Sequence, residues 1–178
     1  RSRKRPLYVL ADNAYRELRY DSDDVPSLLN LAHYPHPVGE IGTFSKSFSP
    51  GLRVGWGVLP PALMQPVQSQ KGNLDFGSPY FSQRIMAKIL ELQLYDLHIA
   101  TIRDCYQTKR NAICAALEDV FQGHSEIHWQ RPLGGLYVWI ELPEHLAAGP
   151  DGRLLETTLN EGTFYVPGEY CFPSEGTL

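Results

Sequence analysis

Short apolar runs that end in polar residues place the strongest limit on how this chain can fold. Residues 7–11, LYVLA, form one such run, and it ends at Asp12. This pattern predicts a strand that is buried on both faces of a parallel sheet. Two further runs, EIGTFSKSF and RVGWGVL, follow on either side of a Pro50-Gly51 turn. Strands joined by turns and helical stretches predict an α/β sheet whose strand ends carry the chemistry.

Helical spacing of apolar residues replaces this pattern from Pro61 onward. One predicted stripe comprises Phe81, Ile85, Ile89 and Leu92. A longer helix is predicted over residues 97–121, with Gly123 as its stop. Three cations are expected on the solvent face of this longer helix, namely Arg103, Lys109 and Arg110.

The last third of the chain predicts a smaller α+β portion. Residues 136–142 alternate between apolar residues that point one way and Tyr137, Trp139 and Glu141 that point the other. A short helix is expected within residues 151–162, and a strand and turn at TFYVPG. We therefore expect a sheet-containing portion over residues 1–97, and a connecting helix with a smaller α+β portion over residues 98–178.

Composition excludes several functional classes. The 178 residues carry a net charge of −4, which argues against a nucleic-acid partner for this segment. No apolar run reaches the roughly 18 residues that a membrane-spanning helix needs. The odd number of cysteines, three, favours a reducing, cytoplasmic location. His33 and His36 have no third partner at metal-ligand spacing, so no metal site is expected.

Lys46 is the most informative candidate for chemistry. It follows an apolar strand and is surrounded by hydroxyl side chains at Thr43, Ser45, Ser47 and Ser49. Burial of such an amine lowers its pKa, which suits a nucleophile that forms an imine. The alternative interpretation is a surface lysine in a serine-rich loop, and the residues alone leave both open.

Arg53, Asp12 and Tyr15 add to this candidate. Arg53 stands seven residues after Lys46, where a guanidinium beside hydroxyls suits a phosphate. Asp12 and Tyr15 follow the first strand, so both would face the same crevice as Lys46. The alternatives are a surface ion pair for Arg53, and a turn with a half-buried anchor for Asp12 and Tyr15.

Four collinear segments carry a specific resemblance to a known family. They are ADNAYRELRYD, GTFSKSFSPGLRVGWGVLP, RPLGGLYVWIELP and FYVPGEYCFP. In order and spacing, they resemble the class I/II pyridoxal-phosphate aminotransferases of fold type I. The subgroup with aminoadipate, kynurenine and aromatic transaminases is the most similar.

The resemblance implies catalytic roles for three residues. Lys46 would form the Schiff base (internal aldimine) with pyridoxal 5′-phosphate and later shuttle a proton. Asp12 would pair with the pyridine nitrogen, and Tyr15 would bond the phenolic oxygen of the ring. The function implied is transfer of an amino group between an α-amino acid and a 2-oxo acid.

The resemblance also implies how the cofactor phosphate is held. Arg53 would bind it, together with Thr43, which stands where the family usually has serine, and Ser45. Gly134 and Gly135 would let the backbone approach the mouth of the site.

The resemblance assigns residues 1–97 to the C-terminal part of the cofactor-binding large domain. Residues 98–178 become the connecting helix and most of the small domain. We expect an interior segment of a longer, homodimeric protein, which lacks the arginine for the substrate carboxylate and is inactive alone. Two alternatives share the same lysine, aspartate and arginine: the effector domain of a GntR/MocR-like transcription regulator, and a lyase or decarboxylase. The amino acid substrate stays open.

Overall fold

The computed structural model describes residues 7–30 and 37–172. The chain divides into two compact units, Arg1–Ala112 with Pro132–Tyr137, and Ile113–Arg131 with Val138–Leu178. The long helix α3 (Leu94–Phe121) contributes residues to both units. The expected domain boundary after residue 97 therefore falls inside α3, and it stays a prediction.

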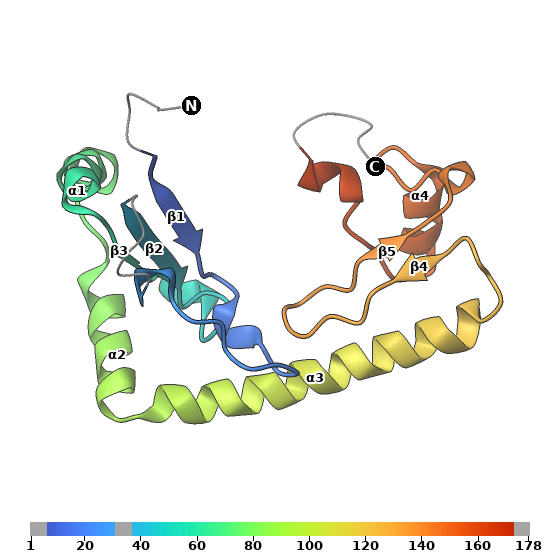
Figure 1. Ribbon diagram of the computed structural model, residues 1–178, viewed down its shortest axis with the longest axis horizontal. Helices are drawn as coiled ribbons and strands as arrows, with labels where there is room; N and C mark the ends of the chain where they lie inside the picture. The colour runs from blue at the N-terminus through green and yellow to red at the C-terminus, as the bar shows by residue number, and fades with distance from the viewer. Residues whose placement is uncertain (1–6, 31–36, 173–178) are drawn as a thin grey trace. The chain divides into compact units, whose positions relative to one another are not determined.

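The first unit contains a sheet of three strands in the order β1-β2-β3 (Figure 1). These are β1 (Val9–Asp12), β2 (Val38–Thr43) and β3 (Gly55–Val58). β1 runs parallel to β2, and β3 runs antiparallel to it. The three predicted apolar runs thus form neighbouring strands, and the parallel pairing expected of the first run is confirmed.

The expectation that β1 is buried on both faces is wrong for the described residues. Val9 and Ala11 are half-buried, whereas Leu10 and Asp12 on the opposite face are exposed. The reason is that successive side chains of a strand point to opposite faces, and the described chain covers only one of them here.

Helices α1 (Pro61–Asp75), α2 (Tyr80–Glu91) and α3 occupy the stretch where helical spacing was predicted (Figure 1). The predicted stripe on α2 is only partly right. Ile85 and Ile89 are half-buried and Phe81 is exposed, while Met86 is the buried residue of this helix. The buried face of α2 is therefore rotated by about one residue from the predicted stripe.

Helix α3 confirms the predicted long helix, but the expectation that Arg110 lies on its solvent face is wrong. Arg103 is partly exposed and Lys109 is exposed, whereas Arg110 is buried. Arg110 lies inside because its guanidinium pairs with the Asp21 carboxylate at 2.5 Å. An acidic partner 89 residues away in sequence thus offsets the cost of burying the charge.

The second unit contains a short antiparallel pair, β4 (His128–Trp129) with β5 (Ile140–Glu141), and helix α4 (Arg153–Asn160). Burial alternates residue by residue over 136–142, as predicted, although only two of these residues pair as a strand. The short helix is confirmed by α4. The strand expected at TFYVPG is wrong, since residues 163–167 form neither helix nor strand.

Within residues 7–30 and 37–172, no helix is both long and apolar enough to cross a membrane. No cluster of three or more metal-ligating side chains occurs there either. His33 and His36 lie outside the described residues, as do RSRKR and the final PSEGTL. The three cysteines are free thiols.

Candidate active site

The residues selected from the sequence gather at one edge of the β1-β2-β3 sheet. β1 ends at Asp12, and the parallel strand β2 ends at Thr43. β3 begins at Gly55, directly opposite Thr43. Asp12 and Thr43 are the last residues of their strands, and the loops that leave this edge carry the other four selected residues: Tyr15, Ser45, Lys46 and Arg53. The carboxyl ends of parallel strands are where α/β proteins bind ligands.

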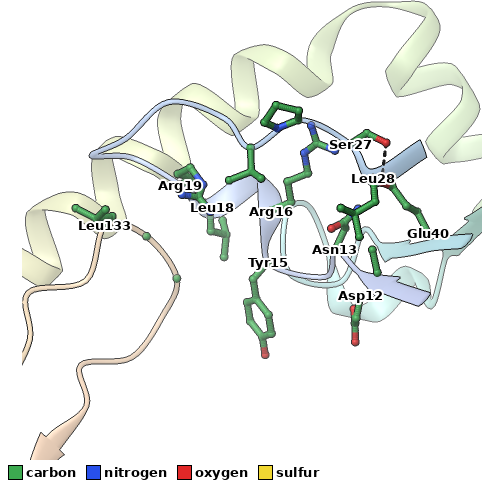
Figure 2. A pocket seen from close by; sticks show the side chains of 15 residues that line it. Asp12, Asn13, Tyr15, Arg16, Leu18, Arg19, Ser27, Leu28, Glu40 and Leu133 are labelled. Carbon is green, nitrogen blue, oxygen red and sulfur yellow. Dashed lines mark hydrogen bonds between the residues drawn. The ribbon is translucent and has the colours of Figure 1, made fainter. Parts of the chain in front are cut away.

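Asp12 is the last residue of β1, and Tyr15 lies on the loop that follows. An Asp12 Oδ1 atom accepts a hydrogen bond of 3.1 Å from the Ala14 N–H, which shapes the turn. The Asn13 N–H donates to the Ile41 carbonyl at 2.8 Å and ties this loop to β2. Figure 2 shows the two side chains, Asp12 and Tyr15, extending to the same side of the loop. Asp12 therefore forms the turn and also presents a carboxylate at the sheet edge.

Lys46 lies on a tight turn just after β2. The Phe48 N–H donates to the Phe44 carbonyl at 2.8 Å and closes the turn. The Lys46 Nζ atom lies 5.7 Å from the centroid of the Tyr15 ring. That distance is within the range of a cation–π contact. The structure thus brings together an amine and a phenol that follow two different strands.

The sequence left open whether Lys46 is a buried amine or a surface lysine, and in the described residues its side chain is exposed. Ser47, the next residue, is buried instead. Within the described chain, the turn is therefore anchored by Ser47 and not by the lysine.

Hydroxyl groups and a guanidinium surround the base of the Lys46 turn. The Thr43 Oγ1 atom accepts a 3.0 Å hydrogen bond from the Ser45 N–H. An Arg53 Nη1 atom donates to the Ser45 Oγ atom at 3.4 Å and to the Pro50 carbonyl at 3.2 Å. These contacts hold two hydroxyls and one permanent positive charge close together, a combination that suits an anion such as phosphate.

A cavity of about 700 Å³ opens beside Asp12 and Tyr15 (Figure 2). Its lining includes Arg16, Glu40 and Gly134, while the other four selected residues do not line it. A Cβ atom at Gly134 would lie 2.6 Å from the Leu18 carbonyl oxygen, so only glycine fits. The expected close backbone approach at this glycine is present, next to the loop of Asp12 and Tyr15.

Two carboxylates near the cavity are held in their ionised form. Arg16 hydrogen-bonds Asp24 at 2.6 Å, which lowers the pKa of Asp24 and raises that of Arg16. The Ser27 hydroxyl donates to Glu40 at 2.6 Å and, with nearby backbone N–H groups, lowers the pKa of Glu40. The first pair joins two residues that follow β1, and the second joins Ser27 to β2.

Sequence reasoning missed the contact beneath the Lys46 turn. The Tyr95 hydroxyl, on α3, donates a 2.7 Å hydrogen bond to the Ser47 Oγ atom. Burial raises the pKa of Tyr95, so the phenol stays protonated and able to donate. No sequence pattern pairs residues 48 positions apart on different elements, although a serine directly beside Lys46 was noted.

Known proteins with similar sequences include a family of enzymes. The family described as "Aminotransferase class I and II" matches residues 1–176. The chain belongs to this family. It is 35% identical to the aromatic-amino-acid aminotransferase 1 of Thermococcus litoralis, over 92% of this chain and 38% of that protein. It is also 35% identical to the 2-aminoadipate transaminase of Thermus thermophilus, over 97% of this chain and 43% of that protein.

Solved aminotransferases share the fold. The α-aminoadipate aminotransferase of Thermus thermophilus, complexed with N-(5′-phosphopyridoxyl)-L-leucine, matches with a TM-score of 0.81 and 35% identity. The match covers 93% of this chain and 42% of that one. The predicted family resemblance and α/β fold class are therefore confirmed. The chain spans about two fifths of the length of these aminotransferase relatives.

Transcription regulators also match at lower identity. The HTH-type regulator YisV of Bacillus subtilis is 29% identical over 98% of this chain and 34% of that protein. The proteins similar to this chain thus include both aminotransferases and regulators.

Proposed function

We propose that the full-length gene product is a pyridoxal-phosphate-dependent aminotransferase, which exchanges amino groups between an α-amino acid and a 2-oxo acid. Family membership and the phosphopyridoxyl ligand of a solved relative support this proposal. The observation that carries it is the approach of the Lys46 amine to the Tyr15 ring, at 5.7 Å, on the sheet edge where Asp12 also lies.

The donor set at this edge fits the cofactor. A carboxylate at Asp12 suits a protonated ring nitrogen, and the Tyr15 phenol suits the oxygen on the same ring. The Arg53 guanidinium, already within hydrogen-bond distance of Ser45, suits the phosphate, with Thr43 beside it. When bound, pyridoxal phosphate supplies an aldehyde that takes up amines and a ring that accepts electron density from the substrate.

Each residue then has a defined task in the proposed reaction. The Lys46 amine would hold the cofactor at its aldehyde carbon and, once free, would accept the proton from the substrate Cα. Asp12 would hold a proton on the ring nitrogen, because its negative charge would balance the positive ring. The Tyr15 hydroxyl would donate to the ring oxygen, and its ring face lies within cation–π distance of the lysine ammonium.

Replacement of the lysine tests this proposal. Full-length wild-type protein, incubated with pyridoxal phosphate and reduced with borohydride, should carry a covalent adduct at Lys46. Lys46→Ala should lose the adduct and retain noncovalent cofactor binding. Lys88→Ala, which removes an exposed lysine paired with Glu91 on α2, is the control and should keep the adduct. A reducible adduct in Lys46→Ala would assign the covalent role to another residue.

The regulator relatives favour one second candidate, in which the same fold is the effector domain of a transcription regulator. The absorbance change of the cofactor on addition of amino donors and then 2-oxoglutarate separates the two. An aminotransferase cycles between aldehyde and amine forms with turnover. A regulator effector domain would bind the cofactor without comparable turnover, and its full-length protein would bind DNA.

The reaction type rests on product analysis. A lyase or decarboxylase would release a fragment or CO₂ from the amino acid. An aminotransferase would instead convert the amino acid to the 2-oxo acid with the same carbon skeleton. We further propose a cytoplasmic location for the full-length protein, since the three thiols are free, and a homodimer, which the family resemblance implies.

A further inference from the structure

The turn that carries Lys46 rests on the first turns of helix α3. Ser47 is only 1% exposed, and its Oγ atom accepts the 2.7 Å hydrogen bond from Tyr95. The same hydroxyl donates to the Thr43 carbonyl at 3.4 Å. A directed chain of hydrogen bonds thus runs from α3 through Ser47 to the end of β2.

Aromatic contacts bracket Lys46 on both sides. The rings of Phe44 and Tyr95 meet edge to face, with centroids 5.6 Å apart. The Phe48 ring meets the His98 ring at 5.0 Å. Residues before and after Lys46 are therefore each held by α3. The Lys46 side chain itself is exposed, so these contacts hold the backbone on either side of it and do not involve its amine.

We infer that Tyr95 is a positioning residue for Lys46, acting through the buried hydroxyl of Ser47. The inference rests on the proposed function, because it assigns Tyr95 a role only if Lys46 bonds the cofactor. A flexible lysine side chain reaches a reacting carbon reproducibly only when its backbone is fixed. The Tyr95 phenol lies 48 residues further along the chain than Ser47 and supplies that constraint from a different element.

The test uses full-length holoenzyme with three variants, Tyr95→Phe, Ser47→Ala and the double variant. Each single change should keep the borohydride-reducible adduct at Lys46. Each should lower kcat by about 3- to 10-fold, the factor that corresponds to one hydrogen bond, with a smaller change in KM. The pH midpoint of the absorbance change of the lysine-linked cofactor should shift in the same variants.

The double variant separates positioning from stability. Removal of both hydroxyls leaves neither of them buried without its partner in the Tyr95–Ser47 bond, so the thermal midpoint should recover toward that of Ser47→Ala or above it. The kcat should stay low, because Lys46 still lacks its anchor. Recovery of kcat in parallel with the thermal midpoint would overturn the inference, as would wild-type kcat and pH midpoint in Tyr95→Phe.

Two further measurements keep the outcomes distinct. Tyr106→Phe is the matched control on the same helix, since Tyr106 contacts Lys109, and it should leave kcat and the pH midpoint unchanged. If Ser47→Ala does not fold, Ser47→Thr replaces it in the test, because threonine keeps the hydroxyl. This variant should retain kcat within about twofold of the wild-type value. A loss of kcat as large as that of Tyr95→Phe would count against the inference. Absence of any adduct at Lys46 in the wild-type protein would instead contradict the proposed function itself.

Discussion

At the scale of single residues, Arg53 of the candidate site has a strained backbone conformation. Its φ is 55°, in the left-handed region that glycine adopts without strain. A residue with a side chain in this region costs on the order of 1–2 kcal/mol. The conformation directs the guanidinium back toward Ser45 and Pro50. Such strain occurs most often at functional sites, which agrees with the proposed phosphate contact.

Arg53→Gly should separate strain from binding. We expect the thermal midpoint of the cofactor-free protein to stay the same or rise slightly, because glycine accepts this backbone conformation. The affinity for pyridoxal phosphate should fall roughly 10- to 100-fold, since a hydrogen-bonded charge is lost. Fluorescence titration of the cofactor measures this affinity.

Gln93→Gly is the matched control for Arg53→Gly. Gln93 has the same φ of 55°, in the link between α2 and α3. This variant should show a similar effect on the thermal midpoint without loss of cofactor affinity. Equal loss of affinity in both variants would mean that the backbone, and not the guanidinium, holds the phosphate.

At the scale of elements, the Arg110 side chain connects helix α3 to two loops. Its guanidinium pairs with Asp21, donates to the Pro132 carbonyl, and lies 5.1 Å from the centroid of the Tyr20 ring. The backbone adds to this junction, since the Asp21 N–H donates to the Leu133 carbonyl at 3.0 Å. The segment that carries Gly134 is thereby held beside the loop that follows β1.

Arg110→Met should destabilise the protein by roughly 2 kcal/mol, because it removes the buried guanidinium that hydrogen-bonds the Asp21 carboxylate and the Pro132 carbonyl. Denaturant midpoints of the cofactor-free protein measure the effect. Lys109→Met, one position earlier on α3 and exposed, should change stability by less than about 0.5 kcal/mol. Similar losses in the two variants would contradict a special role for the buried pair.

Glu40 gives β2 a pH-dependent link to the loop that precedes it. The carboxylate is 3% exposed, and the hydrogen bond from Ser27 is the main cause of its lowered pKa. A pKa below the ordinary value of 4.5 means that folding favours the ionised form. The stabilisation is therefore fully present above pH 4.5 and is lost as the pH falls through the lower folded-state pKa.

The expected result for Glu40→Gln is a lowered thermal midpoint near neutral pH. The difference from wild type should shrink as the pH falls below 4.5, where the wild-type carboxylate also becomes neutral. Thermal scans of the cofactor-free protein between about pH 3 and 7 test this prediction. A difference that is constant over this range would show that the charge of Glu40 does not contribute.

At the scale of the whole molecule, the sheet of the first unit has apolar residues exposed on both faces. Leu10 is 52% exposed on one face, and Val58 is 49% exposed on the other, next to Trp56. Sheets with parallel strands are normally covered on both faces. Since the chain spans about two fifths of its aminotransferase relatives, we expect further chain to cover this sheet in the full-length protein.

The isolated 178-residue chain should therefore bind the dye ANS strongly, whereas the full-length protein should bind it weakly. The same isolated chain should show no aminotransferase turnover. Leu10→Ser should reduce dye binding by the isolated chain, because it removes one of the exposed apolar side chains. Equal dye binding by the isolated and full-length forms would mean that the sheet stays uncovered.

The sequence by itself determined the family, the strands β1 to β3, the long helix α3 and the six residues proposed for the site. These follow from local features: apolar runs, turn residues, helical spacing and four collinear segments. Parallel strands also end at a shared edge, so Asp12 and Lys46 were expected near each other from topology alone.

Only the tertiary structure decided which side chains are buried and which distant residues meet. Arg110 was assigned to solvent and is buried, because its partner Asp21 belongs to another segment. The burial of Lys46 was left open and its side chain is exposed, while Ser47 beside it is buried and bonded to Tyr95. Burial depends on what packs against a residue from elsewhere in the chain, and residue order along one segment carries no record of that partner.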